Sequence, residues 1–557
     1  MSRHHIYNKH AFLRHTHDKH AEKSGGSDTR KGFVLLMKLA PVLAVTLFAG
    51  IETNASTRLP RLVVNITVDG LRSDFMEAFM PLYGEDGFRK LLKEGRVYTH
   101  AEYPSHEPTR SSSVATIATG AVPYDHGIIS TQWLDRNTLR PVYCVDDNQV
   151  QGLKTGDSFS PRNLVVSTIG DELKVATEGK ALVYAISPYS DAAVLSAGHA
   201  ADGAFWIDQK SGNWVGSSYY SETLPAWVTL QNDNGLPSTL HTITWKPASD
   251  LGGNFSYFLG GGVQDPFAHR FKGEGACQSF LTSGLINEYT VALAQQCLQY
   301  TGMGRDDVPD YLAITLWARG FEDKPISNCP MEVQDTYVRL DKALASLISA
   351  AEQTGGKGNT LFVLTSTGTQ EEENADLSRY RIPTGTFYIN RTASILNIML
   401  MAVYGQGNYV EATYGNQIYL NHKLIEDKQL SMTDVLDRCQ ELLLQSQGVK
   451  DAYSSQRLLM GAWTPGISKI RNGYNPRLSG DILVQVAPGW KLINETTHQQ
   501  RLVRESYLNF PIIFYGLDLP AQTIETTVST DCIAPTLSSA MRIRAPNACH
   551  SAAFSGF

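Results

Sequence analysis

The sequence lacks the features that mark several common classes of protein. Its seven cysteines form no Cys-x-x-Cys pair, which excludes a zinc ribbon and a thioredoxin-like redox centre. It has no internal repeat, no low-complexity tract and no long apolar run after residue 50, which excludes a solenoid, a coiled coil and a transmembrane span in the mature chain. In an oxidising compartment we expect one or two disulfides and one odd thiol.

Positive charge is also scarce beyond the N-terminal segment. Residues 56–557 carry 40 Lys and Arg against 51 Asp and Glu, a net charge of −11. Nonspecific binding of nucleic acid needs the opposite sign, so no nucleic-acid partner is expected. The composition, 42% apolar and 18% charged, instead supplies a large packed core, in one domain with insertions or in two domains.

The long apolar stretch that does exist, at residues 32–50, is typical of a secretory signal peptide. Thr53-Asn54-Ala55 follows it with the small-residue pattern of a cleavage site, and Met37 offers a conventional start. We therefore expect residues 1–55 to be a leader whose upstream part is a start-site over-extension. Residues 1–36 hold six of the fifteen histidines, so a metal-scavenging tail and an uncleaved anchor stay open as alternatives.

Beyond the leader, buried strands alternate with helices, as in an α/β protein. A helix is predicted over 333–353, where Leu340, Leu344 and Leu347 share one face. Two long stretches, about 200–300 and 375–480, are rich in aromatic residues, Gly and Asn, and are interpreted as insertions that cover the site. The predicted strands are 61–70, 180–187, 310–317, 359–366 and 511–519.

Three segments after the leader carry a family resemblance: VVNITVDGLRSDF (63–75), GFRKLLKEG (87–95) and VATIATGAVPYDHGI (114–128). They resemble the opening of the type I phosphodiesterase/nucleotide pyrophosphatase branch of the alkaline phosphatase superfamily. Further segments, such as SPRNLVVSTIGDEL (160–173) and SGDILVQVAPGW (479–490), narrow the resemblance to the phosphate-irrepressible bacterial alkaline phosphatases and extend it over nearly the whole mature chain.

The resemblance implies a fold and a location. The expected fold is an alkaline phosphatase-like three-layer α/β sandwich with a mostly parallel central sheet and cap insertions, spanning residues 56–557. The expected location of the exported chain is the periplasm or cell envelope of a Gram-negative bacterium. Nothing in the sequence indicates an oligomeric state.

The resemblance also implies a chemistry, which is phosphate-ester hydrolysis by two zinc ions held by six Asp and His ligands. Asp69, which ends the strand at 61–70, matches the first metal ligand, and His498 matches the last. The carboxyl ends of parallel strands are where ligands gather, although an aspartate there can also simply cap a turn.

The family's Pro-Thr-x-Thr nucleophile segment corresponds to PTRSSSVATIATG, which is one residue shorter. Depending on where the deletion falls, Arg110 or Ser111 takes the place of the nucleophile, with Thr109 beside it. Only a hydroxyl suits that role, so Ser111 and Thr109 are the candidate catalytic residues. The alternative is that Ser111 and Ser112 are ordinary N-cap residues of the next helix.

The other four ligand positions of the family hold residues of different chemistry here. Gly320 and Lys324 stand in place of an Asp-x-x-x-His pair, and Thr367 and Gly368 stand in place of adjacent Asp and His ligands. The residues that replace the phosphate-gripping Lys and Arg and an Asn donor are Tyr189, Asp191 and Thr131.

Nearby acids and histidines are given structural interpretations. Glu322 and Asp323 are interpreted as a solvated turn, and so is the run Glu371–Glu373. His126 and His199 match the family, but they lie in packing segments and are expected to bond backbone groups.

Two main hypotheses follow. The first is a pseudoenzyme, a binding or scaffold protein that recognises a phosphorylated, sulfated or glycan ligand and needs no cofactor. The second is an active metal-dependent phosphoric ester hydrolase, either a phosphomonoesterase or a nucleotide pyrophosphatase/phosphodiesterase. Its nucleophile would be Ser111 or Thr109. Its zinc would be held in a rearranged site by Asp69, His498 and some of Glu322, Asp323 or Glu371. Sulfate-ester cleavage is disfavoured because the Cys-x-Pro-x-Arg signature is absent, and phosphoethanolamine transfer is a minor alternative.

Overall fold

Three of the predicted strands form the centre of one large sheet in a computed structural model of the chain. β1 (Leu62–Asp69) lies between β11 (Asp310–Trp317) and β12 (Thr360–Ser366) and runs parallel to both. Every residue of these strands is buried, as expected for parallel strands that are covered on both faces. The structure describes residues 58–233, 235–248, 267–368, 381, 383–461, 464–503 and 509–557.

The sheet continues on both sides of this centre. Beyond β11, the strands β6 (Val183–Ile186) and β7 (Gly203–Ile207) are also parallel, so five neighbouring strands share one direction. Four further strands pair with a neighbour in antiparallel direction. They are β8 (Trp214–Ser217) and β5 (Gly152–Leu153) beyond β7, and β20 (Phe510–Gly516) and β2 (Arg96–Glu102) beyond β12. Beyond β2, the edge strands β21 (Gln522–Ile524) and β22 (Val528–Ser529) are parallel to β2, and the predicted mostly parallel central sheet is confirmed.

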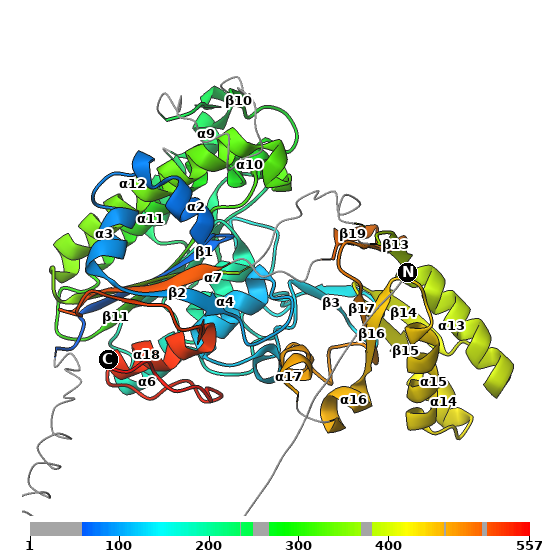
Figure 1. Cartoon of the computed structure of the whole chain (residues 1–557). Coiled ribbons are helices and arrows are strands. Elements are labelled where there is room, and N and C mark those ends of the chain that lie inside the picture. The colour runs from blue at the N-terminus through cyan, green and yellow to red at the C-terminus, as the bar shows by residue number, and fades with distance from the viewer. Residues whose placement is uncertain are drawn as a thin grey trace, which may run out of the picture. The chain divides into compact units, whose positions relative to one another are not determined.

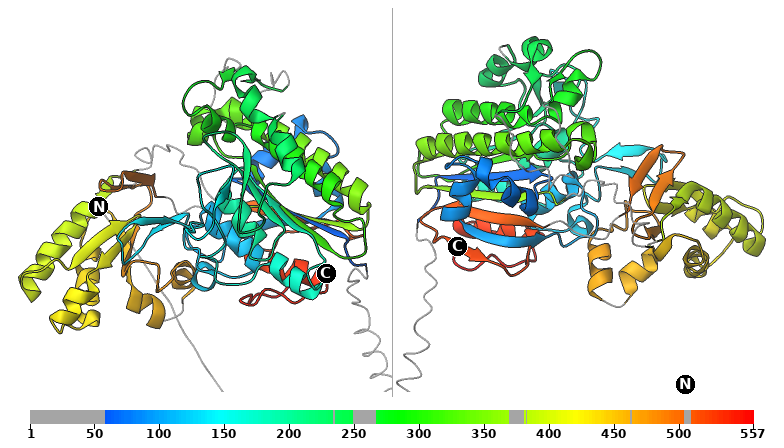
Figure 2. Two further views of the ribbon diagram at one scale, coloured as in Figure 1. Left: turned by 180° about the vertical axis from the view of Figure 1, so that it is seen from behind. Right: turned by 45° about the horizontal axis from the view of Figure 1, so that its top comes forward.

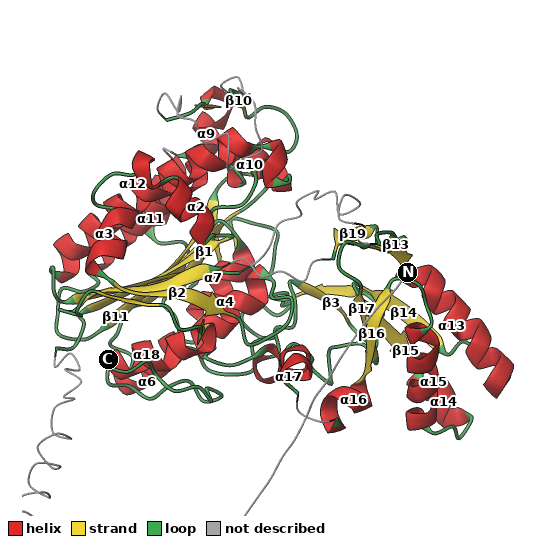
Figure 3. Cartoon of the chain, viewed as in Figure 1, coloured by secondary structure: helices red, strands yellow, loops and turns green. Residues whose placement is uncertain are grey.

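Helices cover both faces of this sheet, which makes three layers (Figures 1 and 3). Alternate residues of β1 point to opposite layers: Val64 and Ile66 pack with α11 (Leu285–Thr301) and α12 (Pro330–Gly355), whereas Val63 packs in the other layer. That second layer contains α4 (Arg110–Thr119), α6 (Ile169–Ala176), α7 (Ser190–Ala197) and α18 (Ile533–Ala540). Figure 2 shows the two layers from other directions.

The predicted insertion at 375–480 corresponds to a unit with its own hydrophobic core, called the cap below, which extends to residue 503. Its four-stranded sheet packs against α13 (Ile389–Tyr404) and α15 (Met432–Leu444) (Figure 1). The strands of this sheet are, in order, β14 (Val410–Tyr414), β15 (Gln417–Leu420), β17 (Ile482–Val486) and β16 (Val449–Ser454). A second, three-stranded sheet contains β13 (Thr386–Tyr388), β18 (Lys491–Asn494) and β19 (Gln499–Leu502).

The predicted insertion at 200–300 is narrower in the structure. Its ends belong to the sandwich, because β7 and β8 are strands of the main sheet and α11 packs over it. The part between them contains α8 (Ala226–Asp233) and α10 (Ala276–Leu281), and residues 249–266 lie outside the described residues.

Several expectations concern the chain as a whole. Among the residues that the structure describes, no helix is both long enough and apolar enough to cross a membrane. The expected disulfides are absent, because all seven cysteines are free thiols, and five of them are buried. The predicted leader, residues 1–55, lies outside the described residues.

Candidate functional site

Four segments meet at the carboxyl edge of the central strands. β1 ends at Asp69, β12 is followed by Thr367, and the helices α4 and α7 begin at Arg110 and Ser190. The chain can leave β1 sharply because Gly70 has a φ of +80°, and a Cβ there would lie 2.3 Å from the Arg319 side chain. This edge is where ligands of parallel sheets bind, so side chains from all four segments are candidates.

Asp69 is fully buried at this edge and bonds side chains from two other segments. The Thr367 hydroxyl donates to its Oδ1 at 2.7 Å, and an Nη atom of Arg110 lies 3.4 Å from its Oδ2. The same Thr367 hydroxyl accepts the Gly70 N–H at 3.2 Å. A hydroxyl from the residue that follows β12 and a cation from α4 therefore contact the carboxylate that matches the first metal ligand.

Arg110 connects Asp69 to a second buried carboxylate, Asp191. Its Nε donates to both oxygens of Asp191, at 3.2 and 3.1 Å, and one Nη donates at 3.0 Å. The guanidinium lies 3.9 Å from the centre of the Tyr189 ring. Burial alone would lower the pKa of Arg110, but Asp191 and Asp69 outweigh it and raise the pKa well above its ordinary value. The cation is therefore permanent and fixed in place.

The two candidate nucleophiles have different surroundings. Ser111 has no exposed surface; its hydroxyl donates to Asp191 at 2.6 Å and lies 3.0 Å from the Thr131 hydroxyl. Thr109 is half-buried and is the N-cap of α4, where it forms a capping box with Ser112. The helix cap is thus Thr109, and the interpretation of Ser111 as an N-cap residue is wrong, because its side chain turns toward Asp191.

His498 does not belong to the cluster around Asp69 and Arg110. It is exposed in the turn between β18 and β19 of the cap, with a φ of 54°. Within the described ranges, no three His, Cys, Asp or Glu side chains are grouped as a metal site requires. The structure thus brings together Asp69, Ser111 and Thr109, which lie around Arg110, and leaves His498 on a hairpin.

The nearby acids behave as solvated turns where the structure describes them. Glu322 and Asp323 are exposed in a single helical turn, Phe321–Asp323, and both have positive φ. Glu322 bonds the ammonium of Lys324 at 2.7 Å and the Ser279 hydroxyl at 2.9 Å, which confirms the structural interpretation. The run Glu371–Glu373 lies outside the described residues.

The two matched histidines bond the backbone, as predicted. Nδ1 of His126 accepts the Ile128 N–H at 3.0 Å, and burial lowers the pKa of this histidine to about 3, so it is neutral. His199 donates to the Leu164 carbonyl at 2.9 Å through Nε2, and its other nitrogen lies 3.0 Å from Asp171. The Asp171 bond raises the pKa of His199. Both rings hold loops in place.

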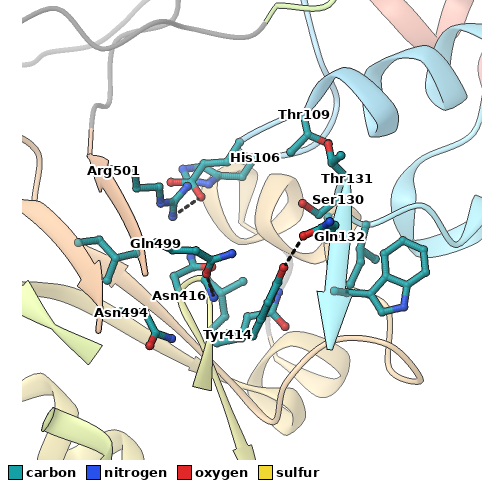
Figure 4. A pocket seen from close by; sticks show the side chains of 18 of the residues that line it. His106, Thr109, Ser130, Thr131, Gln132, Tyr414, Asn416, Asn494, Gln499 and Arg501 are labelled. Atoms are coloured by element: carbon teal, nitrogen blue, oxygen red, sulfur yellow. Dashed lines mark hydrogen bonds and ion pairs between the residues drawn. The ribbon is translucent and has the colours of Figure 1, made fainter. Parts of the chain in front are cut away.

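Two hollows flank the start of α4. The first, of about 660 Å³, is called the arginine pocket, and Arg110, Tyr189, Arg319, Lys210 and Asp323 line it together with buried aromatic side chains. The second, of about 410 Å³, is called the cap groove and lies between the sandwich and the cap (Figure 4). Thr131 lines both hollows, whereas Thr109 lines only the cap groove. Ser111 and Asp69 line neither, because both are buried beneath them.

The ion pair between Arg110 and Asp191 is not predicted from the sequence. The resemblance places Arg110 at the position of the nucleophile and Asp191 at the position of a phosphate-gripping residue, and it does not relate the two positions to each other. The signal was present as a reciprocal change: an arginine appears where a hydroxyl is expected, and an acid appears where a base is expected. Two such changes at one sheet edge indicate that the new side chains pair with each other.

Comparisons with known proteins find relatives that align with most of this chain. A model of the family described as type I phosphodiesterase / nucleotide pyrophosphatase matches residues 63–508. Alkaline phosphatase PafA of Elizabethkingia meningoseptica is 28% identical over 527 residues, which cover 91% of this chain and 96% of that protein. Alkaline phosphatase PhoV of Synechococcus elongatus is 28% identical over 508 residues, with 88% and 91% covered.

A solved structure shows the same similarity in three dimensions. The crystal structure of wild-type PafA matches with a TM-score of 0.77 at 27% sequence identity, covering 90% of this chain and 99% of that chain. The family match spans far more than half of the chain. The chain therefore belongs to the type I phosphodiesterase/nucleotide pyrophosphatase family, a branch of the alkaline phosphatase superfamily.

Proposed function

We propose that this chain is an exported binding protein of the alkaline phosphatase fold, a pseudoenzyme that recognises its ligand without two-metal hydrolysis. One observation carries the proposal: the guanidinium of Arg110 lies between the buried carboxylates of Asp69 and Asp191. A protein cation already neutralises the charge at the place where the family's chemistry needs metal ions.

The donor chemistry supports the same conclusion for zinc. Zinc prefers Cys, His and carboxylate ligands, and a catalytic site needs at least three of them per ion. Here Asp69 is bonded by Thr367 and Arg110, and the positions of four expected ligands hold Gly320, Lys324, Thr367 and Gly368. The residues present do not fit a two-zinc centre.

The surroundings of the two candidate nucleophiles also support a pseudoenzyme. Ser111 is fully buried and donates to Asp191, so its oxygen has no path to a substrate. Thr109 reaches the cap groove, but its hydroxyl accepts the N–H of Ser112 as a helix cap. Uncatalysed hydrolysis of phosphate esters is among the slowest known reactions, so a site without an activated nucleophile gives no useful rate.

The two hollows favour binding as the retained role. They present a charged surface at Arg110 and a neutral, amide-rich surface under the cap, and both have volumes that suit a small ligand. The proposed partner is a phosphorylated, sulfated or glycan molecule in the periplasm or cell envelope of a Gram-negative bacterium.

Enzymatic turnover tests the proposal. The full chain is incubated with zinc and with nitrophenyl phosphate, as a monoester and as a diester, beside the variants Asp69→Asn and Thr109→Ala. We expect no hydrolysis above that of the variants for either substrate. Hydrolysis by the wild type that either substitution abolishes would overturn the proposal.

An active hydrolase is the second candidate. It is favoured by the relatives, two of which are named alkaline phosphatases and align over most of this chain, and by the Thr109 hydroxyl at the cap groove. In that case Thr109 would be the nucleophile, and Asp69 would supply one ligand of a metal ion. The Thr109→Ala variant distinguishes the pseudoenzyme from the hydrolase. Only a hydrolase would lose phosphoesterase activity when the Thr109 hydroxyl is removed.

A further inference from the structure

We propose that the cap groove binds an uncharged oligosaccharide. The inference rests on the proposed function, since it names the ligand class of the same binding protein, but it stands on a separate set of side chains. The groove has a volume of about 410 Å³, within the range of about 300–1,000 Å³ that is typical of small-molecule sites.

The charges of the ionisable side chains that line the groove cancel. Glu107 and Arg501 form an ion pair at 2.9 Å (Figure 4), and although burial opposes it, Arg501 keeps the pKa of Glu107 below its usual value. Burial lowers the pKa of His106, which is therefore neutral near pH 7. No other Asp, Glu, His, Lys or Arg among the described residues lines the groove. A free anion thus meets no uncommitted positive charge.

Amide side chains supply the polar contacts that remain. The carbonyl of Gln132 accepts the Tyr414 hydroxyl at 3.1 Å, and the carbonyl of Gln499 accepts the Gly415 N–H at 3.1 Å. The amide nitrogen of Gln132 has no partner in the described part of the chain. Gln499 also bonds the side chain of Tyr414, which uses one of the two donors of its amide nitrogen. Asn416 is the reverse case: its nitrogen donates to the Val484 carbonyl at 3.3 Å, and its oxygen is unused by the described residues. The groove therefore offers both donors and an acceptor.

Aliphatic side chains from both the sandwich and the cap also line the groove: Ile129, Ile470, Leu483 and Leu492. A sugar ring combines hydroxyls, each of which donates and accepts, with a face of C–H groups. Mixed amide donors and acceptors beside aliphatic groups match that combination. In Figure 4, Tyr414, Asn416 and Gln499 of the cap lie beside one another, and Tyr414 reaches Gln132 on β3 (Gln132–Leu134), so one ring can contact amide groups from both parts.

Calorimetry with defined probes tests the inference. The full chain is titrated with maltohexaose, cellohexaose and chitohexaose, and separately with inorganic phosphate and a sulfated heparin hexasaccharide. We expect at least one neutral hexasaccharide to bind at one site per chain, with no competition from phosphate. Gln132→Ala and Gln499→Ala should each weaken this binding about threefold to tenfold, as the loss of one neutral hydrogen bond does.

A matched control is Gln445→Ala, because Gln445 is exposed at the end of α15 and does not line the groove. The affinity of this control variant for the neutral hexasaccharide should equal that of the wild type. Thermal melting checks that all variants fold. The inference is overturned if no neutral hexasaccharide binds, if only the sulfated probe binds, or if the groove variants bind as tightly as the control. Phosphoester turnover with intact oligosaccharide binding would instead contradict the proposed function alone.

Discussion

Among single residues, Arg110 is the one that connects the buried acids of the site. Its guanidinium bonds Asp191 and lies 3.4 Å from Asp69, and only 16% of its side chain is exposed. Buried ion pairs add little net stability compared with apolar groups, but breaking one leaves an uncompensated charge, which is costly. Loss of Arg110 would leave two buried carboxylates, Asp69 and Asp191, without their common counter-charge.

We therefore predict that Arg110→Ala lowers the free energy of unfolding by about 3 kcal/mol. The double variant Arg110→Ala with Asp191→Asn should recover part of the loss, because it removes one of the stranded charges. Urea unfolding measures both. Arg391→Ala breaks the exposed ion pair with Glu495 and should leave the unfolding midpoint unchanged. An Arg110→Ala protein as stable as this control contradicts the assigned role.

His126 gives a prediction about pH. It is fully buried with a pKa of about 3 in the folded protein, whereas an unfolded histidine titrates near 6.5. Its contribution to stability is therefore complete above about pH 6.5 and is lost as the pH falls toward 3, by about 1.4 kcal/mol per pH unit. In urea unfolding between pH 7 and 5, His126→Asn should reduce the slope of stability against pH. An unchanged slope would mean that other groups cause it.

At the scale of elements, the start of α4 organises the site. Thr109 caps the helix through Ser112, and this cap fixes Arg110 and Ser111 as the first two helical residues. Thr109→Ala should destabilise the protein by about 1 kcal/mol in urea unfolding, whereas Thr109→Ser should keep the cap and most of the stability. Equal midpoints for the two variants would show that the cap hydroxyl contributes nothing.

The predicted strands and the long helix were recovered from sequence because their signals are local. Continuous runs rich in β-branched residues predict β1, β11 and β12, and the leucine spacing predicts α12. Between β1 and β2 the chain forms two short helices, α2 (Ser73–Ala78) and α3 (Phe88–Glu94), because Pro81 and the glycines at 84 and 87 separate them. The ion pair of Arg110 with Asp191 was missed because it joins residues 81 positions apart.

At the scale of the whole molecule, a few polar links join the sandwich to the cap. Arg136, in the turn after β3 (Gln132–Leu134), bonds both oxygens of Asp481 at 3.1 Å and the Ser479 carbonyl at 2.6 Å. Asp481 is buried, and its pKa is held below the usual value by His422 and Arg136, although burial opposes this. The cap groove lies beside this link, so its geometry depends on the cap staying docked.

Arg136→Ala should therefore loosen the cap without unfolding the sandwich. Hydrogen exchange should become faster in β14, β15 and β17 of the cap, while β1 and β11 keep their protection. Lys469→Ala removes the more exposed link to Glu102 and is the matched control, with little expected change. Uniformly faster exchange throughout the chain would indicate global destabilisation instead.

The most direct test of the central claim, that Arg110 has taken the place of catalytic metal ions, is zinc binding measured by calorimetry on the full chain and on its Asp69→Asn variant. The six histidines at the N-terminus can bind zinc by themselves, so the comparison between the two proteins decides the result. We predict identical zinc isotherms for the two proteins. Two additional zinc ions per wild-type chain, lost on substitution of Asp69, would contradict the account.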